Sequence, residues 1–393
     1  MHKSHGKPFI PYGKHAISQA DIDAVVNVLT SDCLTQGPVV PEFESAVARQ
    51  VQANHAVAVN SATSALHIAC LALELGPGDT LWTSPITFVA TANCAFYCNA
   101  QVDFVDIDPN TGLMDINKLS SKLEHAESLG NLPKVVIPVH LAGTSCDMHA
   151  IKALSCRYGF HIIEDASHAI GGYYDHHPVG SCEYSDITIF SLHPVKIITS
   201  GEGGIATTNN SFLADQMKLL RSHGIVKDNS KFITSGVEPW KYEQQFLGYN
   251  YRMTDIHAAL GLSQLQRLES VVAERNRQRL LYLELLDKTP VTFLAIPDNV
   301  LSSVHLAILR LDTFDADFHR NIFHQLRDLG IGVQLHYYPV HLQPYFHQFG
   351  FISGDFPCAE SYAKNSFSIP LFPGLKDSEI HYVADMIHQL VSG

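Results

Sequence analysis

The sequence predicts an α/β protein with a large domain on a mostly parallel central sheet and a smaller α+β C-terminal domain. Two observations favour this fold class. Between residues 53 and 208, short apolar runs alternate with stretches of helical periodicity, and parallel strands need such crossover helices. The chain also has 393 residues, of which 46% are hydrophobic. That is too much chain for one ordinary domain.

Seven short segments are the expected strands of the large sheet. In chain order they are HAVAVN (55–60), TLWTS (80–84), VDFVDI (102–107), KVVIPV (134–139), FHIIED (160–165), DITIFS (186–191) and residues 205–208. Helices fit between them. One is expected at 64–75, with Leu66, Cys70 and Leu73 on one face, and another at 147–158 behind an acidic cap.

The next segments lead from the large domain to the small one. A helix is expected from 211 to about 224, followed by a polar, turn-rich surface loop at 226–240. The longest helical pattern then covers 254–286, with a cap at Thr254 or Asp255. This helix is predicted to link the two domains.

A strand, a helix and a second strand are expected in the C-terminal domain, at 303–311, 315–329 and 331–339. The predicted division of the chain is a large domain at 15–255, a small domain at 256–393, and an N-terminal arm at 1–14 that joins the small domain.

Composition excludes several classes of function. A formal charge of −13 would repel nucleic acids and anionic membranes. There is no apolar run of membrane-spanning length and no signal peptide, so a soluble, cytoplasmic protein is expected. The 23 histidines form no HExxH pattern, and Cys94 and Cys98 read as buried small residues rather than ligands. No metal is expected.

Two residues at strand ends carry the main chemical prediction. Asp165 ends FHIIED and Lys196 follows DITIFS, so both should reach the sheet edge where open α/β proteins bind ligands. Pyridoxal phosphate needs an amine to form a Schiff base and a carboxylate to keep its pyridine nitrogen protonated. A lysine in a loop is usually a solvated charge. Here the preceding apolar strand, Pro194 and the glycine-rich GEGG (201–204) favour the cofactor interpretation.

Three further features fit that cofactor but have ordinary alternatives. NSATSAL (60–66) could cradle a phosphate at a helix start through Ser61 and Thr63, although such caps are common. Phe88 could stack on the pyridine ring or be a core aromatic. His168 could bond the ring hydroxyl or the aspartate, or be a satisfied structural histidine.

With these residues in place, the chain resembles the DegT/DnrJ/EryC1 family of sugar aminotransferases over essentially its whole length. The resemblance rests on NSATSAL, TSPITFVATAN, IIEDASHAIGG, FSLHPVKIITSGEGG, GYNYRMTDIHAALGLSQL and VQLHYYPVHLQPYF. It implies the pyridoxal-phosphate-dependent transferase fold of type I, which is aspartate-aminotransferase-like. It also implies a homodimer with active sites at the subunit boundary.

The resemblance also implies roles for individual residues. For the cofactor, it makes Lys196 the Schiff-base lysine, Asp165 the partner of the ring nitrogen and His168 its neighbour, with Ala62, Thr63, Phe88, Ser191 and Asn250 as further contacts. For the sugar nucleotide it implies Tyr12, Asp32, Cys33, Leu34, Thr35, Ser191, His336, Tyr337 and Tyr338. Asn250 is expected to reach the partner subunit's cofactor phosphate. Arg252 could neutralise a diphosphate or the donor carboxylate, or form a structural ion pair.

Within the family, the closest likeness is to enzymes that aminate C4 of a UDP-linked 4-keto-6-deoxy-N-acetylhexosamine on the pseudaminic acid route, with L-glutamate as donor. Sister enzymes making perosamine or bacillosamine precursors share much of the pattern. Sugar dehydratases of this fold replace the lysine with histidine, whereas this chain has Lys196. A regulatory homologue would be expected to lose Lys196 or Asp165. A nicotinamide dehydrogenase would need GxGxxG where this chain has NSATSA.

Overall fold

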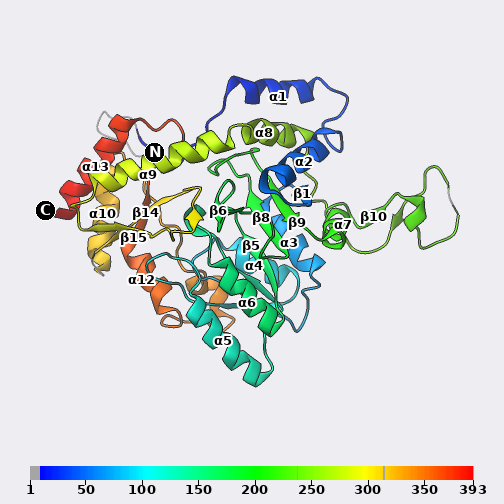
Figure 1. Ribbon diagram of the computed structural model, residues 1–393, viewed down its shortest axis with the longest axis horizontal. Coiled ribbons are helices and arrows are strands. Elements are labelled where there is room, and N and C mark those ends of the chain that lie inside the picture. Colours follow the sequence, from blue (N-terminus) through cyan, green and yellow to red (C-terminus); the bar gives the residue numbers. More distant parts are fainter. Residues whose placement is uncertain (1–8, 237, 313–314, 393) are drawn as a thin grey trace.

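A seven-stranded sheet forms the centre of the molecule in the computed structural model, which describes residues 9–236, 238–312 and 315–392 (Figure 1). The strand order is β1-β9-β8-β5-β4-β2-β3. The strands are β1 (His55–Val59), β2 (Thr80–Thr83), β3 (Gln101–Phe104), β4 (Val135–Ile137), β5 (His161–Asp165), β8 (Ile187–Ser191) and β9 (Gly204–Thr208). Only β9 runs antiparallel to its neighbours. All seven expected strands are confirmed, with small shifts at their ends.

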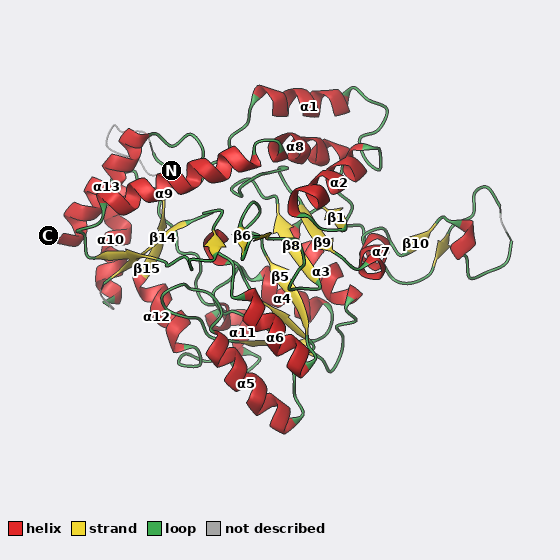
Figure 2. Ribbon diagram, in the orientation of Figure 1, coloured by secondary structure: helices red, strands yellow, loops and turns green. Residues whose placement is uncertain are grey.

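Helices cover both faces of this sheet (Figure 2). They are α1 (Gln19–Leu29), α2 (Val39–Val51), α3 (Ala62–Ala72), α4 (Ala90–Tyr97), α5 (Ile116–Leu129), α6 (Met148–Tyr158) and α7 (Ser211–Leu220). In β1, Val57 and Val59 point into one core while Ala56 and Ala58 point into the other. This alternation buries the sheet on both sides, as a mostly parallel sheet requires.

The sequence predicts a single helix at 254–286, and this prediction is wrong in one respect, because the structure has two helices there. They are α8 (Asp255–Leu265) and α9 (Leu268–Leu285). Arg267, at the break, donates from Nη2 to Asp21 Oδ2 at 2.6 Å and so ties the junction to α1. The N-cap is Thr254, whose hydroxyl accepts the His257 N–H.

A second sheet, in the order β12-β14-β15, packs with the C-terminal helices around a third core. Its parts are β12 (Val291–Phe293), β14 (Ala307–Leu311), β15 (Ser366–Ile369), α10 (Ala316–Asp328) and α13 (Asp377–Ser392). The short helices α11 (Pro344–His347) and α12 (Pro357–Asn365) instead bury Phe346, Ala359 and Tyr362 in a core of the large sheet. Ile10 from the N-terminal arm also lies in this core, whereas residues 1–8 of the arm fall outside the described residues. The domain boundary near residue 255 stays a prediction.

Two expected strands of the small domain need correction. The strand expected at 303–311 begins only at Ala307, because His305 donates its N–H to Ala142 O of the large body at 2.8 Å. The strand expected at 331–339 is wrong. Its backbone makes single bridges at Ile331 and Gln334 and then leaves the sheet. The alternating pattern arose because Ile331 and Val333 are buried in the third core.

The segment expected as an irregular loop at 226–240, of which residue 237 is outside the described residues, otherwise lies in a projection from the body (Figure 1). The projection is closed by the short ribbon β10 (Ile225–Val226) and β11 (Glu243–Gln244). The helix before it, α7, ends at Leu220 rather than near Gly224. The remaining short strands, β6 (Tyr173–Tyr174), β7 (His177–Pro178) and β13 (Val300–Leu301), form a small sheet of their own.

None of the helices within the described ranges combines the length and the apolar character needed to cross a membrane. The described residues also contain no group of three or more His, Cys, Asp or Glu side chains arranged to hold a metal ion. Cys94 and Cys98 are both buried, as expected.

Candidate active site

Asp165 and Lys196 come together at the carboxyl edge of the central sheet. Asp165 is the last residue of β5 and pairs with Ile189 of the neighbouring parallel strand β8. Lys196 follows β8 in a tight turn, in which its N–H donates to His193 O at 2.9 Å. Because parallel strands end at the same edge, both residues lie at the sheet edge where the sequence predicts a ligand crevice.

The Lys196 ammonium lies in an environment that favours loss of its proton. Burial lowers the pKa of Lys196 to about 8, although the nearby Asp165 carboxylate acts in the opposite direction. No described residue accepts a hydrogen bond from its Nζ. The amine is therefore free to react and is partly neutral near pH 7 to 8.

The Asp165 carboxylate is held at both oxygens. Thr91 donates its hydroxyl to Oδ2 at 2.6 Å, and the N–H of Ser167 donates to Oδ1 at 3.1 Å. The preceding residue, Glu164, is satisfied by His140 Nε2 at 2.7 Å and by the Thr188 hydroxyl at 2.9 Å. Only Asp165 of the two acids is therefore available to a ligand in the crevice. No pattern in the sequence points to Thr91.

His168 is held as a neutral imidazole of one tautomer. Its Nδ1 accepts the Ala142 N–H at 3.2 Å, so Nε2 carries the proton and donates to Tyr337 Oη at 3.0 Å. Burial lowers the pKa of His168 well below its usual range, and the charge of Lys196 acts in the same direction. Burial also raises the pKa of Tyr337.

The start of α3 offers an anion site beside these residues. Ser61 caps the helix by accepting the Ser64 N–H at 3.2 Å, and the first N–H groups of an α-helix have no partner within the helix. Gly204 in β9 packs against this start, where an added Cβ would lie 2.5 Å from Ala62 N. Gly204 also pairs with Ser191, so Ala62, Thr63 and Ser191 lie close to one another.

Several predicted substrate residues gather on the other side of the crevice. Tyr12 is half-buried, with its ring 5.1 Å from that of His336. His336 meets the Ser368 hydroxyl at 2.8 Å, and burial lowers its pKa to about 3. Phe88 is 59% exposed, and its ring lies 6.3 Å from that of Tyr337. The core-aromatic alternative for Phe88 is therefore wrong.

Other predicted residues lie elsewhere in the single chain. Asp32, Cys33, Leu34 and Thr35 are exposed, and Leu34 O accepts the N–H of Asp255 at 3.0 Å, at the start of α8. Exposed Asn250 bridges to Ser222, and Arg252 pairs with Val59 at the end of β1. Among the described residues, Arg252 forms no ion pair.

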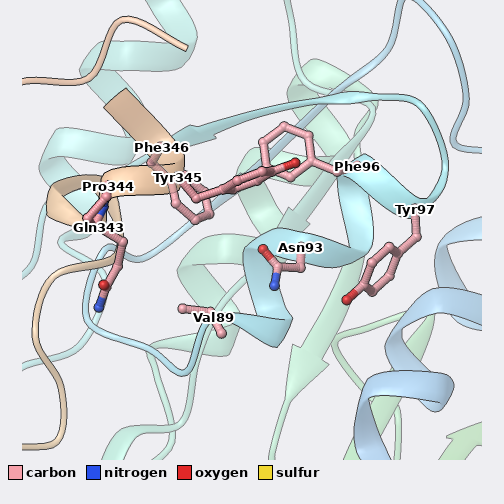
Figure 3. Close-up of a pocket in the computed structure, with 8 residues that line it drawn as sticks. All are labelled: Val89, Asn93, Phe96, Tyr97, Gln343, Pro344, Tyr345 and Phe346. Carbon is pink, nitrogen blue, oxygen red and sulfur yellow. The ribbon is translucent and has the colours of Figure 1, made fainter. Parts of the chain in front are cut away.

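A surface cavity of about 410 Å³ lies between α4 and the segment around α11, and no cationic side chain lines it (Figure 3). Its wall comes from α4 and from the segment around α11, with the Phe96 and Tyr345 rings on one side and Asn93 below them. The lining residues are Val89, Asn93, Phe96, Tyr97, Gln343, Pro344, Tyr345 and Phe346. These residues include no amine and no carboxylate, so this cavity does not fit the cofactor as the Lys196 site does.

The residues of the crevice fit pyridoxal phosphate. Lys196 supplies a free amine, Asp165 a clamped carboxylate, and the α3 start an anion cradle that any side chain at Gly204 would invade.

The family model for the DegT/DnrJ/EryC1/StrS aminotransferases matches residues 15–388. The chain belongs to this family. It is an aminotransferase, and the fold predicted from the sequence is confirmed.

Individual relatives cover almost the whole chain. The spore coat polysaccharide biosynthesis protein SpsC of Bacillus subtilis is 37% identical over 98% of each chain. The UDP-4-amino-4,6-dideoxy-N-acetyl-beta-L-altrosamine transaminase of Campylobacter jejuni is 36% identical over 97% of each. Among solved structures, the sugar aminotransferase Spr1654 of Streptococcus pneumoniae in its PLP form superposes with a TM-score of 0.88. It is 29% identical, over 98% of this chain and 99% of that one.

Proposed function

We propose that this aminotransferase moves an amino group from L-glutamate to C4 of a UDP-linked 4-keto-6-deoxy-N-acetylhexosamine, with Lys196 as its catalytic residue. The observation that carries the proposal is the free, partly neutral amine of Lys196 within electrostatic reach of Asp165. The choice of sugar rests on the motif around LHYYPVHLQPYF (335–346) and on the likeness to the Campylobacter jejuni transaminase.

Pyridoxal phosphate, when bound, supplies an electron-accepting ring that makes the α-proton of the donor acidic. Lys196 would hold the cofactor covalently until the donor displaces it. The released Nζ is then a neutral base, because its burial disfavours the ammonium form. In that state it takes the α-proton of glutamate and later returns a proton during amination of the sugar. One base placed in the crevice can serve both half-reactions.

The other residues orient the reactants. Asp165 would accept a hydrogen bond from the pyridine N–H, and the start of α3 with Ser191 would bind the phosphate. Phe88, exposed beside Tyr337, offers an aromatic face for the pyridine ring. His168 and Tyr337 form a neutral pair of hydrogen-bonding groups next to it. Tyr12, His336 and Tyr338 would contact the sugar nucleotide.

We also propose a homodimer that works in the cytoplasm. Asp32 to Thr35 and Asn250 are exposed in the single chain, and a second subunit packed against them would give them their predicted roles at a shared site. The exposed ring of Phe88 is consistent with a site completed at a subunit boundary.

Two measurements test this function. Adding L-glutamate to the purified holoenzyme, with no sugar present, should bleach the cofactor absorbance and produce 2-oxoglutarate. An unchanged spectrum would contradict glutamate as donor. Mass spectrometry of products from a panel of UDP- and dTDP-linked keto-sugars tests the acceptor. Amination of dTDP sugars alone would overturn the proposed substrate.

A further inference from the structure

A chain of two threonine hydroxyls ends on the Asp165 carboxylate. Thr91 Oγ1 lies 2.6 Å from Asp165 Oδ2, and Thr87 Oγ1 lies 2.8 Å from Thr91 Oγ1. All three side chains are buried, with exposed fractions of 5%, 1% and 2% for Asp165, Thr91 and Thr87. Water therefore does not compete for these bonds.

The direction of the chain follows from the available protons. An ionised carboxylate accepts hydrogen bonds only, so Thr91 must donate its single hydroxyl proton to Asp165. The bond between the two hydroxyls must then run from Thr87 to Thr91. Without that second bond, the Thr91 hydroxyl could rotate toward a backbone carbonyl of the preceding loop, such as Phe88 O, which already accepts the Thr91 N–H. Thr87 thus holds Thr91 in the orientation that serves Asp165.

The carboxylate needs such support because its own side chain does not fix it. The terminal torsion of aspartate is broad, so the plane of the two oxygens is set by surrounding donors. Here one donor reaches each oxygen: Thr91 bonds Oδ2 and the Ser167 N–H bonds Oδ1 at 3.1 Å. With both bonds in place, the plane of the Asp165 carboxylate is fixed, and so are the directions of the remaining lone pairs on Oδ1 and Oδ2.

We propose that Thr91 is a positioning residue, which through its bond to Asp165 aligns that carboxylate with the pyridine nitrogen of the cofactor, and that Thr87 supports Thr91. The inference rests on the proposed role of Asp165. Residues 87–91 would then contribute to two contacts with the cofactor. Phe88 would stack on the face of the ring, and Thr91 would orient the carboxylate that binds the ring nitrogen.

The test uses pyridoxal phosphate labelled with ¹⁵N at its ring nitrogen, bound to the full-length holoenzyme. The ¹⁵N chemical shift reports protonation of that nitrogen, and equilibrium dialysis gives the cofactor dissociation constant. Thr91→Val keeps the shape but removes the hydroxyl, Thr91→Ser restores it, and Thr87→Val removes only its support. Thr207→Val is the matched control, since that buried hydroxyl donates to Gly180 O at 2.8 Å, at the opposite end of β9 from Gly204.

For Thr91→Val we expect roughly tenfold weaker cofactor binding and a ¹⁵N signal moved toward the deprotonated form, because a bond to a charged group is lost. Thr87→Val should move both readouts in the same direction by less. Thr91→Ser should stay close to the unsubstituted enzyme, and Thr207→Val should change neither readout even if it lowers thermal stability.

A Thr91→Val enzyme with an unchanged ¹⁵N signal and unchanged cofactor affinity would overturn the inference. Asp165→Asn separates this failure from that of the proposed function. If Asp165→Asn shifts the ¹⁵N signal but Thr91→Val does not, only the positioning role is wrong. If neither substitution shifts the signal, the proposed role of Asp165 itself is wrong. Should Thr91→Val fail to fold, a Thr87→Val enzyme that matches Thr207→Val in both readouts would overturn the inference.

Discussion

Tyr337 Oη lies 3.0 Å from His168 Nε2, and the two rings are nearly parallel with their centroids 6.0 Å apart. Because Nδ1 of His168 accepts the Ala142 N–H, the bond runs from the imidazole to the phenol. The tyrosine hydroxyl therefore keeps its own proton available for a group in the crevice. This pair links the segment after β5 to the segment after residue 331, which the sequence places far apart.

Removing the phenol oxygen should leave a buried donor without an acceptor. We expect Tyr337→Phe to lower the free energy of unfolding by about 1–2 kcal/mol, measured by chemical denaturation. Tyr338→Phe is the control, because that neighbouring side chain is 50% exposed, and its substitution should change stability little. Equal stability of the two variants would show that the bond to His168 contributes nothing.

The Lys196 amine should titrate far below an ordinary lysine. Competitive acetylation of the cofactor-free protein, followed by mass spectrometry, should give a pH midpoint for Lys196 of about 8. Asp165→Asn should move this midpoint lower still, because the carboxylate favours the ammonium form. A midpoint for Lys196 near the ordinary lysine value of 10.5 would contradict the burial argument.

The same shift has a consequence for folding. Between pH 8 and 10.5 the unfolded chain keeps the Lys196 proton while the folded chain has lost it, so stability should rise with pH across this window. Lys196→Met should make the cofactor-free protein more stable than the unsubstituted protein below pH 8, and the difference should vanish toward pH 10.5. Denaturation curves at several pH values measure this difference in stability. A difference that stays constant with pH would contradict the lowered pKa of Lys196.

The close approach of Gly204 to the α3 start predicts intolerance of a methyl group. In Gly204→Ala the added Cβ would lie 2.5 Å from Ala62 N, so strand and helix must separate. We expect a loss of about 1–3 kcal/mol in stability and at least roughly tenfold weaker cofactor binding. Gly76→Ala is the control, because the atom nearest to its added Cβ would be Glu74 O, at 4.0 Å. Undiminished cofactor affinity in Gly204→Ala would place the phosphate elsewhere.

A mixed dimer tests whether Asn250 serves the partner subunit's site. One chain would carry Lys196→Ala and the other Asn250→Ala, with different affinity tags for purification. If Asn250 acts across the boundary, one of the two sites is intact and the mixed dimer should keep about half of the activity. If it acts within its own chain, neither site is intact, and activity should be no more than about half that of the Asn250→Ala homodimer.

The sequence was sufficient for the sheet and for the two residues at its edge. Lys196 and Asp165 could be predicted because parallel strands bring their ends together, whatever the loops do. The strand expected at 331–339 failed because alternate burial of Ile331 and Val333 imitates a strand without a neighbouring one. The helix expected at 254–286 failed at Arg267, whose bond to Asp21 no local pattern reveals.

The supporting residues of the site could not be predicted for a different reason. Thr87 lies in the loop before α4 and Thr91 in the first turn of that helix, where threonines are ordinary, and only the fold brings Asp165 to them. In the same way, the GEGG segment predicts a turn. The requirement for glycine at position 204 comes from the close approach of β9 to the start of α3, which the sequence does not reveal. Spacing in the sequence identifies strand ends better than it identifies contacts between elements.

Reduction with borohydride identifies the lysine that holds the cofactor. Treating the native holoenzyme with borohydride fixes the cofactor on the lysine that holds it, and peptide mass spectrometry then identifies that residue. We expect a single modified lysine, Lys196, and no modification in Lys196→Ala, which should remain folded but lose activity by at least about 1,000-fold. Modification of another lysine, or full activity in Lys196→Ala, would contradict the assignment of Lys196.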